Sequence, residues 1–354
     1  MSLESKIKIF NPNELGKKNA NIFGLPFTVD EARVVVVPVP WEVTVSYGGG
    51  TVNGPEAIFN ASMQVDLYDP YLPNAWKLGI AMDTIPKKLK GVSNTLRKKA
   101  ERYIDLLSAE KKSDKNAVMK KIRSDINGAC GTMIAHVQAT TKKYLQQEKM
   151  VALIGGDHST PLGFIHALAE QYDNFGILQI DAHADLRNAY EGFTYSHASI
   201  MFNALKEIKN VSALVQVGIR DYCEEEMDVI KNSNGRVVTY FDKEIKHSVY
   251  RGKSISDLHK EIVAHLPANV YISFDIDGLD PKLCPNTGTP VPGGFEFEEA
   301  VHLIQTLAES GRKIIGIDVN EVSPRDDEWD ANVGSRLLYR MINIMAKSNG
   351  INNL

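Results

Sequence analysis

The residues best suited to chemistry in this sequence are acids and histidines that directly follow short apolar runs. Four segments have this form: Gly155-Gly156-Asp157-His158, Asp181-Ala182-His183-Ala184-Asp185, Asp275-Ile276-Asp277 and Asp318-Val319-Asn320-Glu321. In open α/β sheets, ligands bind beyond the carboxyl ends of the parallel strands. If the apolar runs are neighbouring strands, these acids and histidines meet at one edge of a sheet.

Each segment alone has an ordinary structural explanation, because a carboxylate after a strand often caps a helix and a single histidine is often only hydrogen-bonded. Together they indicate a metal site. Asp181, His183 and Asp185 alternate along the chain, so their side chains would share one face if strand geometry persists. Asp275 and Asp277 repeat that spacing. Several carboxylates in one cleft repel one another unless cations neutralise them, and two divalent ions would balance four negative charges.

The types of the predicted ligands narrow the choice of ion. Two imidazoles with four carboxylates and no thiolate suit Mn²⁺, and less often Ni²⁺ or another divalent transition metal. A structural zinc site would more typically use cysteine and close four positions, whereas six ligands suit a catalytic pair of ions. The sequence therefore predicts two Mn²⁺, or alternatively two Ni²⁺ or similar ions, held by His158, Asp181, His183, Asp185, Asp275 and Asp277.

The elements that must position these residues alternate between strands and helices. Runs rich in β-branched residues predict strands at 34–37, 151–154, 176–180, 213–217, 237–240, 270–274 and 314–317, with a weaker candidate at 78–82. Segments long enough for helices lie at 93–107, 116–145, 256–265 and 296–307. Such alternation is typical of an α/β protein in which helices cover both faces of a parallel sheet.

Composition and charge restrict the class of protein. The chain has 354 residues, of which 43% are hydrophobic, and no repeat or Pro-rich linker divides it. We therefore expect one domain over residues 1–354, with an N-terminal extension of about residues 1–30. The 40 basic and 44 acidic residues are well mixed, so we expect no nucleic-acid or membrane partner. The mixed-charge stretch 110–115 is interpreted as a solvated loop rather than a binding tail.

Cysteine usage and the N-terminus bear on location. Cys130, Cys223 and Cys284 are far apart and form no CxxC pair, which favours a reducing compartment over a disulfide framework. The first residues contain no apolar stretch like a signal peptide, and no window approaches the roughly 18 apolar residues of a membrane span. We expect a cytoplasmic protein.

At these motifs the sequence resembles the ureohydrolase family of arginases and agmatinases, from about residue 34 to the C-terminal helix, and is most similar in character to agmatinases. The segment Gly54-Pro55-Glu56-Ala57-Ile58 is also similar to the opening of the family's N-terminal helix. Five separate stretches carry the resemblance in order: Gly155-Gly156-Asp157-His158-Ser159, Asp181-Ala182-His183-Ala184-Asp185, Ser273-Phe274-Asp275-Ile276-Asp277-Gly278-Leu279-Asp280-Pro281, Gly288-Thr289-Pro290 and Gly293-Gly294.

The resemblance implies a fold and an arrangement of ligands. The fold is a three-layer α/β/α sandwich with a mainly parallel eight-stranded sheet. One ion would be held by His158, Asp181, Asp185 and Asp275, and the other by Asp181, His183, Asp275 and Asp277, so that Asp181 and Asp275 bridge. The family's members are commonly trimers or hexamers, which implies a homo-oligomer.

The implied reaction is hydrolysis of a guanidino C–N bond to urea and an amine. Water between two divalent ions has a pKa near neutrality and can attack the guanidinium carbon. Asp185 would move a proton to the departing nitrogen. His197 resembles the family's proton-shuttling or substrate-contacting histidine; otherwise it only starts a helix. Glu321 resembles the carboxylate that pairs with the substrate guanidinium, supported by Asp318; otherwise it is a surface acid.

The sequence does not decide which chemical group the substrate carries besides its guanidino group. Arg187 stands close after Asp185 and could bind a substrate carboxylate, as in formiminoglutamate, guanidinobutyrate or guanidinopropionate, or it could form an internal salt bridge. Trp41, Tyr47 and Trp329 could close over a compact substrate such as guanidine, or simply pack in the core. The glycines at 48–50 fit an entrance loop better than a phosphate-binding loop.

Two other classes of protein remain as alternatives. A zinc deacetylase of the same fold would use one metal with fewer ligands. A catalytically silent scaffold would be expected to lack some ligands, and none of the six is missing here.

Overall fold

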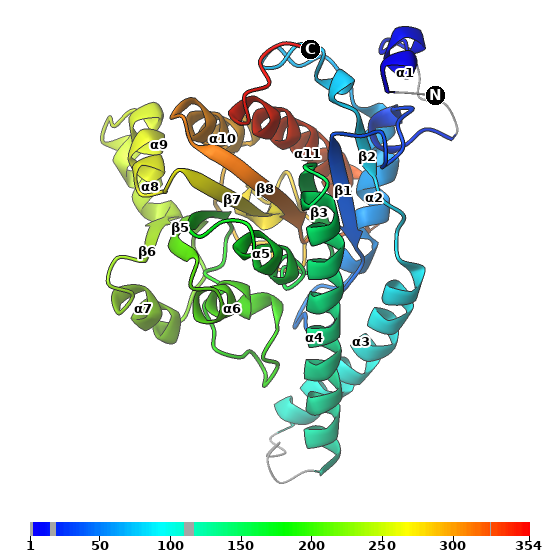
Figure 1. Cartoon of the computed structure of the whole chain (residues 1–354). Helices are drawn as coiled ribbons and strands as arrows, with labels where there is room; N and C mark the ends of the chain where they lie inside the picture. The colour runs from blue at the N-terminus through cyan, green and yellow to red at the C-terminus, as the bar shows by residue number, and fades with distance from the viewer. Residues whose placement is uncertain (1–2, 15–18, 110–116, 326) are drawn as a thin grey trace.

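One parallel sheet forms the middle of the molecule (Figure 1). The computed structural model describes residues 3–14, 19–109, 117–325 and 327–354. Within those residues the sheet has eight strands in the order β2-β1-β3-β8-β7-β4-β5-β6, and every neighbouring pair is parallel. The strands are β1 (Val34–Val39), β2 (Ile80–Met82), β3 (Met150–Gly155), β4 (Phe175–Ile180), β5 (Val211–Ile219), β6 (Val237–Phe241), β7 (Asn269–Asp275) and β8 (Lys313–Asn320).

Helices cover both faces of the sheet, which confirms the predicted three-layer α/β/α sandwich. One layer contains α2 (Gly54–Ala61), α8 (Asp242–Tyr250), α9 (Ile255–Ala264), α10 (Phe297–Glu309) and α11 (Trp329–Ser348). The opposite layer contains α3 (Lys87–Ser108), α4 (Ala117–Leu145), α5 (Leu162–Ala169), α6 (Ile200–Glu207) and α7 (Glu224–Lys231). A short helix, α1 (Leu3–Ile9), packs near the β2 edge.

Strand residues supply both cores because successive side chains of a strand point to opposite faces. In β1, Val34 and Val36 belong to the core under α10 and α11, while Val35 and Val37 belong to the core under α4 and α5. A strand buried on both faces is apolar at nearly every position. This double burial explains why the strands were recognisable as continuous apolar runs.

The predicted strands are all confirmed, and the weak candidate at 78–82 is the edge strand β2. The predicted long helices correspond to α3, α4, α9 and α10, although Asn116 and the charged stretch 110–115, predicted to be a solvated loop, lie outside the described residues. Several short helices were missed. In α5 all but two residues are buried, so the helix lacks the polar face that would have revealed a 3.6-residue period.

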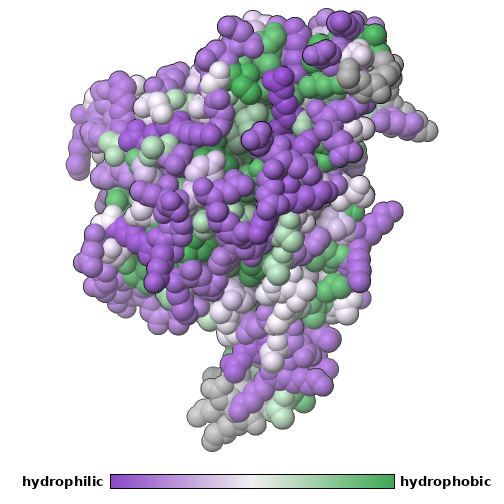
Figure 2. Space-filling model, viewed as in Figure 1, coloured by the Kyte–Doolittle hydropathy of each residue, from purple (hydrophilic) through white to green (hydrophobic). Residues whose placement is uncertain are grey.

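Helices α3 and α4 form a long pair that projects beyond the sandwich (Figures 1 and 2). Their facing sides are apolar and buried, as at Tyr103 and Ile126. Lys and Arg outnumber Asp and Glu in both helices, so charge is less evenly mixed than the overall composition indicates. No helix in the described part of the chain is both long and apolar enough to cross a membrane.

Four adjacent strands in the middle of the sheet, β3, β8, β7 and β4, carry the chemical motifs at their carboxyl ends. Because all four are parallel, these ends lie along the same edge of the sheet. The sheet order therefore brings together motifs that are up to about 160 residues apart in sequence.

Candidate metal centre

The predicted metal ligands converge at the carboxyl edge of the central strands. Asp181 follows β4 directly, and Asp275 is the last residue of β7. His158 comes three residues after the end of β3. The side chains of His158, Asp181, Asp275 and Asp277 are almost completely buried.

The ligands do not converge through strand alternation, so the prediction that alternate residues of one strand share a face here was wrong. Strand β4 ends at Ile180, and Asp185 has a left-handed backbone with φ of 55°. Similarly, Asp277 lies in a 3₁₀ turn (Ile276–Gly278), where its backbone N–H donates to Asp275 Oδ1 at 2.9 Å. The carboxylates are therefore aimed by turns that begin where the strands stop.

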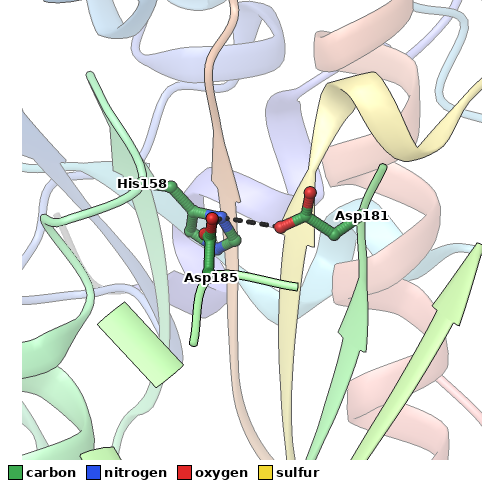
Figure 3. Close-up of side chains that lie close together, drawn as sticks. All are labelled: His158, Asp181 and Asp185. Carbon is green, nitrogen blue, oxygen red and sulfur yellow. Dashed lines mark ion pairs between the residues drawn. The ribbon is translucent and has the colours of Figure 1, made fainter. Parts of the chain in front are cut away.

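His158 lies at the centre of one group of carboxylates. Its Nδ1 atom is 3.0 Å from Asp181 Oδ2, 3.1 Å from Asp185 Oδ2 and 3.3 Å from Asp275 Oδ2. Figure 3 shows His158, Asp181 and Asp185 pointing toward one another from separate segments, with the contact between His158 and Asp181 dashed. A second group surrounds His183, whose Nδ1 atom is 3.0 Å from Asp277 Oδ2 and 3.7 Å from Asp181 Oδ1.

These residues fit a pair of metal ions. Two groups have ligand atoms within 4.8 Å of one another, His158 with Asp181 and Asp185, and Asp181 with His183 and Asp277. Asp181 belongs to both groups, as a bridging ligand would. His158 Nδ1 is buried and faces three carboxylates without the geometry of a hydrogen bond to any of them. A buried nitrogen that faces only acceptors is suited to bind a cation in place of its proton.

Asp275 lies beside the first group but completes neither of the two compact sets. Its bridging role therefore remains a prediction.

Electrostatics around the cluster indicate a deficit of positive charge. Burial and the neighbouring Asp181 raise the pKa of Asp185 to about 7. Burial, Asp277 and Asp181 raise the pKa of Asp275 well above its usual value. Burial lowers the pKa of His158, but contacts with Asp181, Asp185 and Asp275 outweigh it and raise that pKa strongly. A divalent cation would remove the repulsion that raises the carboxyl pKa values.

Buried hydrogen bonds orient the His158 ring at Nε2, the nitrogen that does not face the carboxylates. Its Nε2 atom lies 2.9 Å from Ser273 Oγ, and the Ser273 hydroxyl donates to Asp318 Oδ1 at 3.2 Å. Partners of this kind fix the ring orientation and tautomer of a ligating histidine. Asp318 therefore supports His158 through Ser273, and not Glu321, the residue that the resemblance expected it to support.

A cavity of about 140 Å³ opens onto the cluster and includes His197 and Glu321 in its wall. Glu321 Oε1 accepts the backbone N–H of His158 at 2.8 Å, whereas Oε2 is buried without a partner. The half-buried His197 begins a 3₁₀ turn (His197–Ser199), and its Nδ1 also lacks a partner. Burial, helped by the charges of His183 and His158, lowers the pKa of His197 to about 3.

Arg187 lies in the same wall, near an internal carboxylate, and its contact with substrate stays a prediction. Arg187 lines the cavity, and its guanidinium carbon lies 4.8 Å from the centre of the Tyr190 ring. Its Nε atom is also 3.9 Å from Glu226 Oε2, at the outer limit of an ion pair. Glu226 Oε1 is engaged at 3.0 Å by the Leu186 N–H.

None of the three aromatic residues considered as pocket lids forms part of the cavity wall. Trp41 is buried in the core beneath α4. Trp329 lies at the start of α11, where its indole N–H donates to the Lys282 carbonyl at 2.9 Å. Tyr47 is 79% exposed, next to Ser46, which does line the cavity. The wall is instead lined by Tyr190 and Tyr222.

Sequence reasoning missed several polar residues near the site, among them Asp221 in the cavity wall. Glu226 supports the Arg187 loop, and its only sequence signal is its place three residues into a helix that begins after Cys223. Gln179 and Gln216 are buried next to the metal cluster. Their signal was a polar side chain within an otherwise apolar strand.

Comparisons with known proteins agree with this geometry. A model described as the arginase family matches residues 32–343. N(1)-aminopropylagmatine ureohydrolase from Thermus thermophilus is 31% identical over 89% of this chain and 91% of its own length. An agmatinase from Bacillus cereus is 27% identical over 85% and 87%. The structure of proclavaminate amidinohydrolase from Streptomyces clavuligerus matches 95% of this chain and 100% of its own, with a TM-score of 0.71 at 23% identity, and so shares the fold.

Proposed function

Because the chain belongs to the arginase family, we propose that it is a hydrolase that cleaves a guanidino C–N bond to give urea and an amine. The observation that carries this proposal is the shared Asp181 between two possible metal groups, next to a cavity with an unpaired carboxylate oxygen of Glu321. A zinc deacetylase site with one metal would not need the second group around His183.

The proposed ligands are those expected from the sequence. His158, Asp181, Asp185 and Asp275 would hold one ion, and Asp181, His183, Asp275 and Asp277 the other. Two divalent ions, proposed to be Mn²⁺ or alternatively Ni²⁺, would supply Lewis acidity and lower the pKa of water toward neutrality.

The chain's own residues would orient the substrate and move a proton. Glu321 would bind the substrate guanidinium through its unpaired oxygen, because a buried carboxylate pairs well with a planar cation. As water attacks the guanidinium carbon, Asp185 would accept a proton from the water and deliver it to the departing nitrogen. His197, in the cavity wall with an unpartnered Nδ1, would contact the substrate or relay that proton. The C–N bond then breaks to release urea and an amine.

We propose an agmatinase-like substrate with a cationic tail. Among the described residues of this part of the wall, Asp221 and Glu226 accompany one Arg, Arg187, so carboxylates outnumber permanent cations there. Two relatives also have names that refer to agmatine or its aminopropyl derivative. The second candidate is a carboxylate-bearing substrate, such as guanidinobutyrate or formiminoglutamate, bound by Arg187, which lies only 3.9 Å from Glu226 and could exchange partners.

A substrate panel tests this proposal. Protein loaded with Mn²⁺ or with Ni²⁺ should release product from one of agmatine, guanidinobutyrate, guanidinopropionate, guanidine, arginine or formiminoglutamate. Urea is measured for the guanidino substrates and formamide for formiminoglutamate. Agmatine turnover would support the cationic-tail assignment, and preference for an acidic substrate would favour the Arg187 alternative. Absence of turnover on every member of the panel with either metal would contradict the function.

Three further properties belong to the same proposal. We infer a single domain over residues 1–354 with an N-terminal extension of about residues 1–30, a homo-oligomer (trimer or hexamer), and a cytoplasmic location without a nucleic-acid or membrane partner. The three unpaired cysteines, Cys130, Cys223 and Cys284, support a reducing compartment. Light scattering coupled to size exclusion would determine the oligomeric state.

A further inference from the structure

Two fully buried glutamines lie directly behind the proposed metal centre. Gln179 is in β4 and Gln216 is at the paired position of the neighbouring strand β5. A buried amide destabilises the core unless its donors and acceptor are hydrogen-bonded. The partners of these two amides therefore indicate why polar side chains occupy otherwise apolar strands.

The two amides form a continuous chain of hydrogen bonds that ends on Asp181. Gln179 Nε2 donates to Asp181 Oδ2 at 2.8 Å and to the His183 carbonyl at 3.2 Å. Gln216 Nε2 donates to Gln179 Oε1 at 2.7 Å and to the Ala184 carbonyl at 2.6 Å. The hydroxyl of Thr239, in β6, donates to Gln216 Oε1 at 2.8 Å. All four amide N–H donors are used.

The orientation of each amide follows from the chemistry of its partners. The Asp181 carboxylate and the His183 carbonyl can only accept, so the amino group of Gln179 must face them. Its oxygen then faces Gln216 and requires a donor, which only the amino group of Gln216 supplies. The hydroxyl of Thr239 satisfies the remaining oxygen. The chain therefore has a single direction, from Thr239 to Asp181.

These bonds hold the part of the loop that carries three predicted ligands. Asp181 is the residue common to both possible metal groups. The two anchored carbonyls belong to His183 and Ala184, the residues just before Asp185. Asp185 has a left-handed backbone with φ of 55°, which is uncommon for a residue other than glycine. Anchoring both carbonyls fixes the backbone that aims His183 and Asp185.

We propose that Gln179 and Gln216 are positioning residues that arrange Asp181, His183 and Asp185 for metal binding before any ion is present. A neutral amide suits this role because it orients the carboxylate of Asp181 and leaves its negative charge available to a cation. A lysine or arginine in the same place would instead compete with the ion. The inference rests on the proposed function, since it assumes that the cluster binds divalent metal.

The main experiment replaces each glutamine with methionine, which keeps the length of the side chain and removes its hydrogen bonds. Mn²⁺ affinity is measured by competition with a chelator, and hydrogen exchange of the 182–185 amides is followed in metal-free protein. For Gln179→Met we expect metal affinity to fall about 10- to 100-fold and those amides to exchange faster. Gln216→Met should shift both measurements in the same direction. Gln138 lies on the surface of α4 and donates to Glu170, so Gln138→Met is the matched control. It should change neither the metal affinity nor the exchange rates.

A milder pair of variants keeps the proposal testable if a methionine variant fails to fold. Thr239→Val removes only the first bond of the chain at a half-buried position, and Thr239→Ser retains it. We expect weaker Mn²⁺ binding and faster exchange at 182–185 for valine, with serine restoring both. The proposal is overturned if Gln179→Met, or Thr239→Val where methionine prevents folding, binds Mn²⁺ as wild type does with unchanged exchange.

These measurements use no substrate, so they are separate from the test of function. Loss of metal affinity in a protein that hydrolyses none of the guanidino compounds would uphold the positioning role and contradict the proposed reaction.

Discussion

Replacing Glu321 with glutamine separates binding of the substrate cation from construction of the metal site. The substituted amide can keep its oxygen toward the His158 N–H, where Glu321 Oε1 now accepts at 2.8 Å. The other oxygen, buried without a partner, becomes an NH₂ group that cannot accept from a guanidinium. The change therefore removes the charge pairing proposed for the substrate and preserves the hydrogen bond to the His158 backbone.

The expected loss is large because the pairing is buried and charge-assisted. Losing one partner of such a pair costs about 2 to 5 kcal/mol, which corresponds to a decrease in kcat/KM of roughly 30- to 4,000-fold at about 1.4 kcal/mol per tenfold change. We expect a decrease in the middle of this range, near 300-fold. Mn²⁺ affinity should stay within about threefold of wild type, because no proposed ligand is altered.

The assay follows urea release from the best substrate of the panel, together with Mn²⁺ binding by calorimetry. Glu321→Ala is the comparison variant, because it also removes the acceptor of the His158 N–H and should weaken Mn²⁺ binding as well as turnover. If Glu321→Gln retained kcat/KM within threefold of wild type, Glu321 would not be the guanidinium-binding residue, and the assignment of the cavity would have to change.

Three other predictions follow from single contacts. Asp181→Asn and Asp275→Asn should each release metal and abolish urea formation, and metal analysis showing full occupancy with normal activity in either variant would contradict the ligand assignment. If Arg187 binds a substrate carboxylate, as the second candidate requires, Arg187→Ala should raise KM at least tenfold for acidic substrates and spare neutral-tailed ones; equal effects on both kinds would exclude that role. Burial, His302 and Lys246 lower the pKa of His259 to about 4, so the free energy of unfolding should fall by up to about 3 kcal/mol as pH drops from about 6.5 toward 4. In denaturant titrations, His259→Gln should flatten this part of the curve of unfolding free energy against pH. An unchanged slope in the variant would show that His259 is not the source of the pH dependence.

The pH prediction has a definite sign. An unfolded histidine takes up a proton near pH 6.5, whereas buried His259, 2.7 Å from the His302 ring nitrogen, resists protonation until about pH 4. Between these values the unfolded state binds the extra proton, so acidification favours unfolding. Above pH 7 both states are neutral at this position and the contribution to the pH dependence vanishes.

The sequence predicted the sheet and the meeting of the motifs for a physical reason. A strand buried on both faces must be apolar almost throughout, so polar residues that follow an apolar run mark the carboxyl end of the strand. This is the case after Ile180 in β4 and after Gly155 in β3. Parallel strands place such ends at one edge, whatever path the connecting chain takes. The order of the strands itself was not predictable in this way, because apolar runs contain no information about which neighbours they pair with.

What the sequence could not give was the geometry beyond the strand ends. Asp185 is aimed by a left-handed backbone and Asp277 by a 3₁₀ turn, neither of which has a local signature in the Ala-rich and Ile-containing segments around them. Trp41 was assigned two equal roles because a large aromatic residue serves a core or a pocket equally well, and only tertiary packing decides between them.

Gln179 and Gln216 suggest how such geometry can still leave a trace in sequence. Each interrupts an apolar strand, and burying an unpaired amide is unfavourable enough that the interruption implies a fixed partner. Gln179 lies two residues before Asp181 and its amino group reaches that carboxylate, while Gln216 on the next strand reaches the loop beyond it. A polar residue inside a buried strand, close to a predicted ligand, therefore predicts the group that orients that ligand. For this protein, the rule is tested by the difference in Mn²⁺ affinity between the two glutamine-to-methionine variants and the control Gln138→Met.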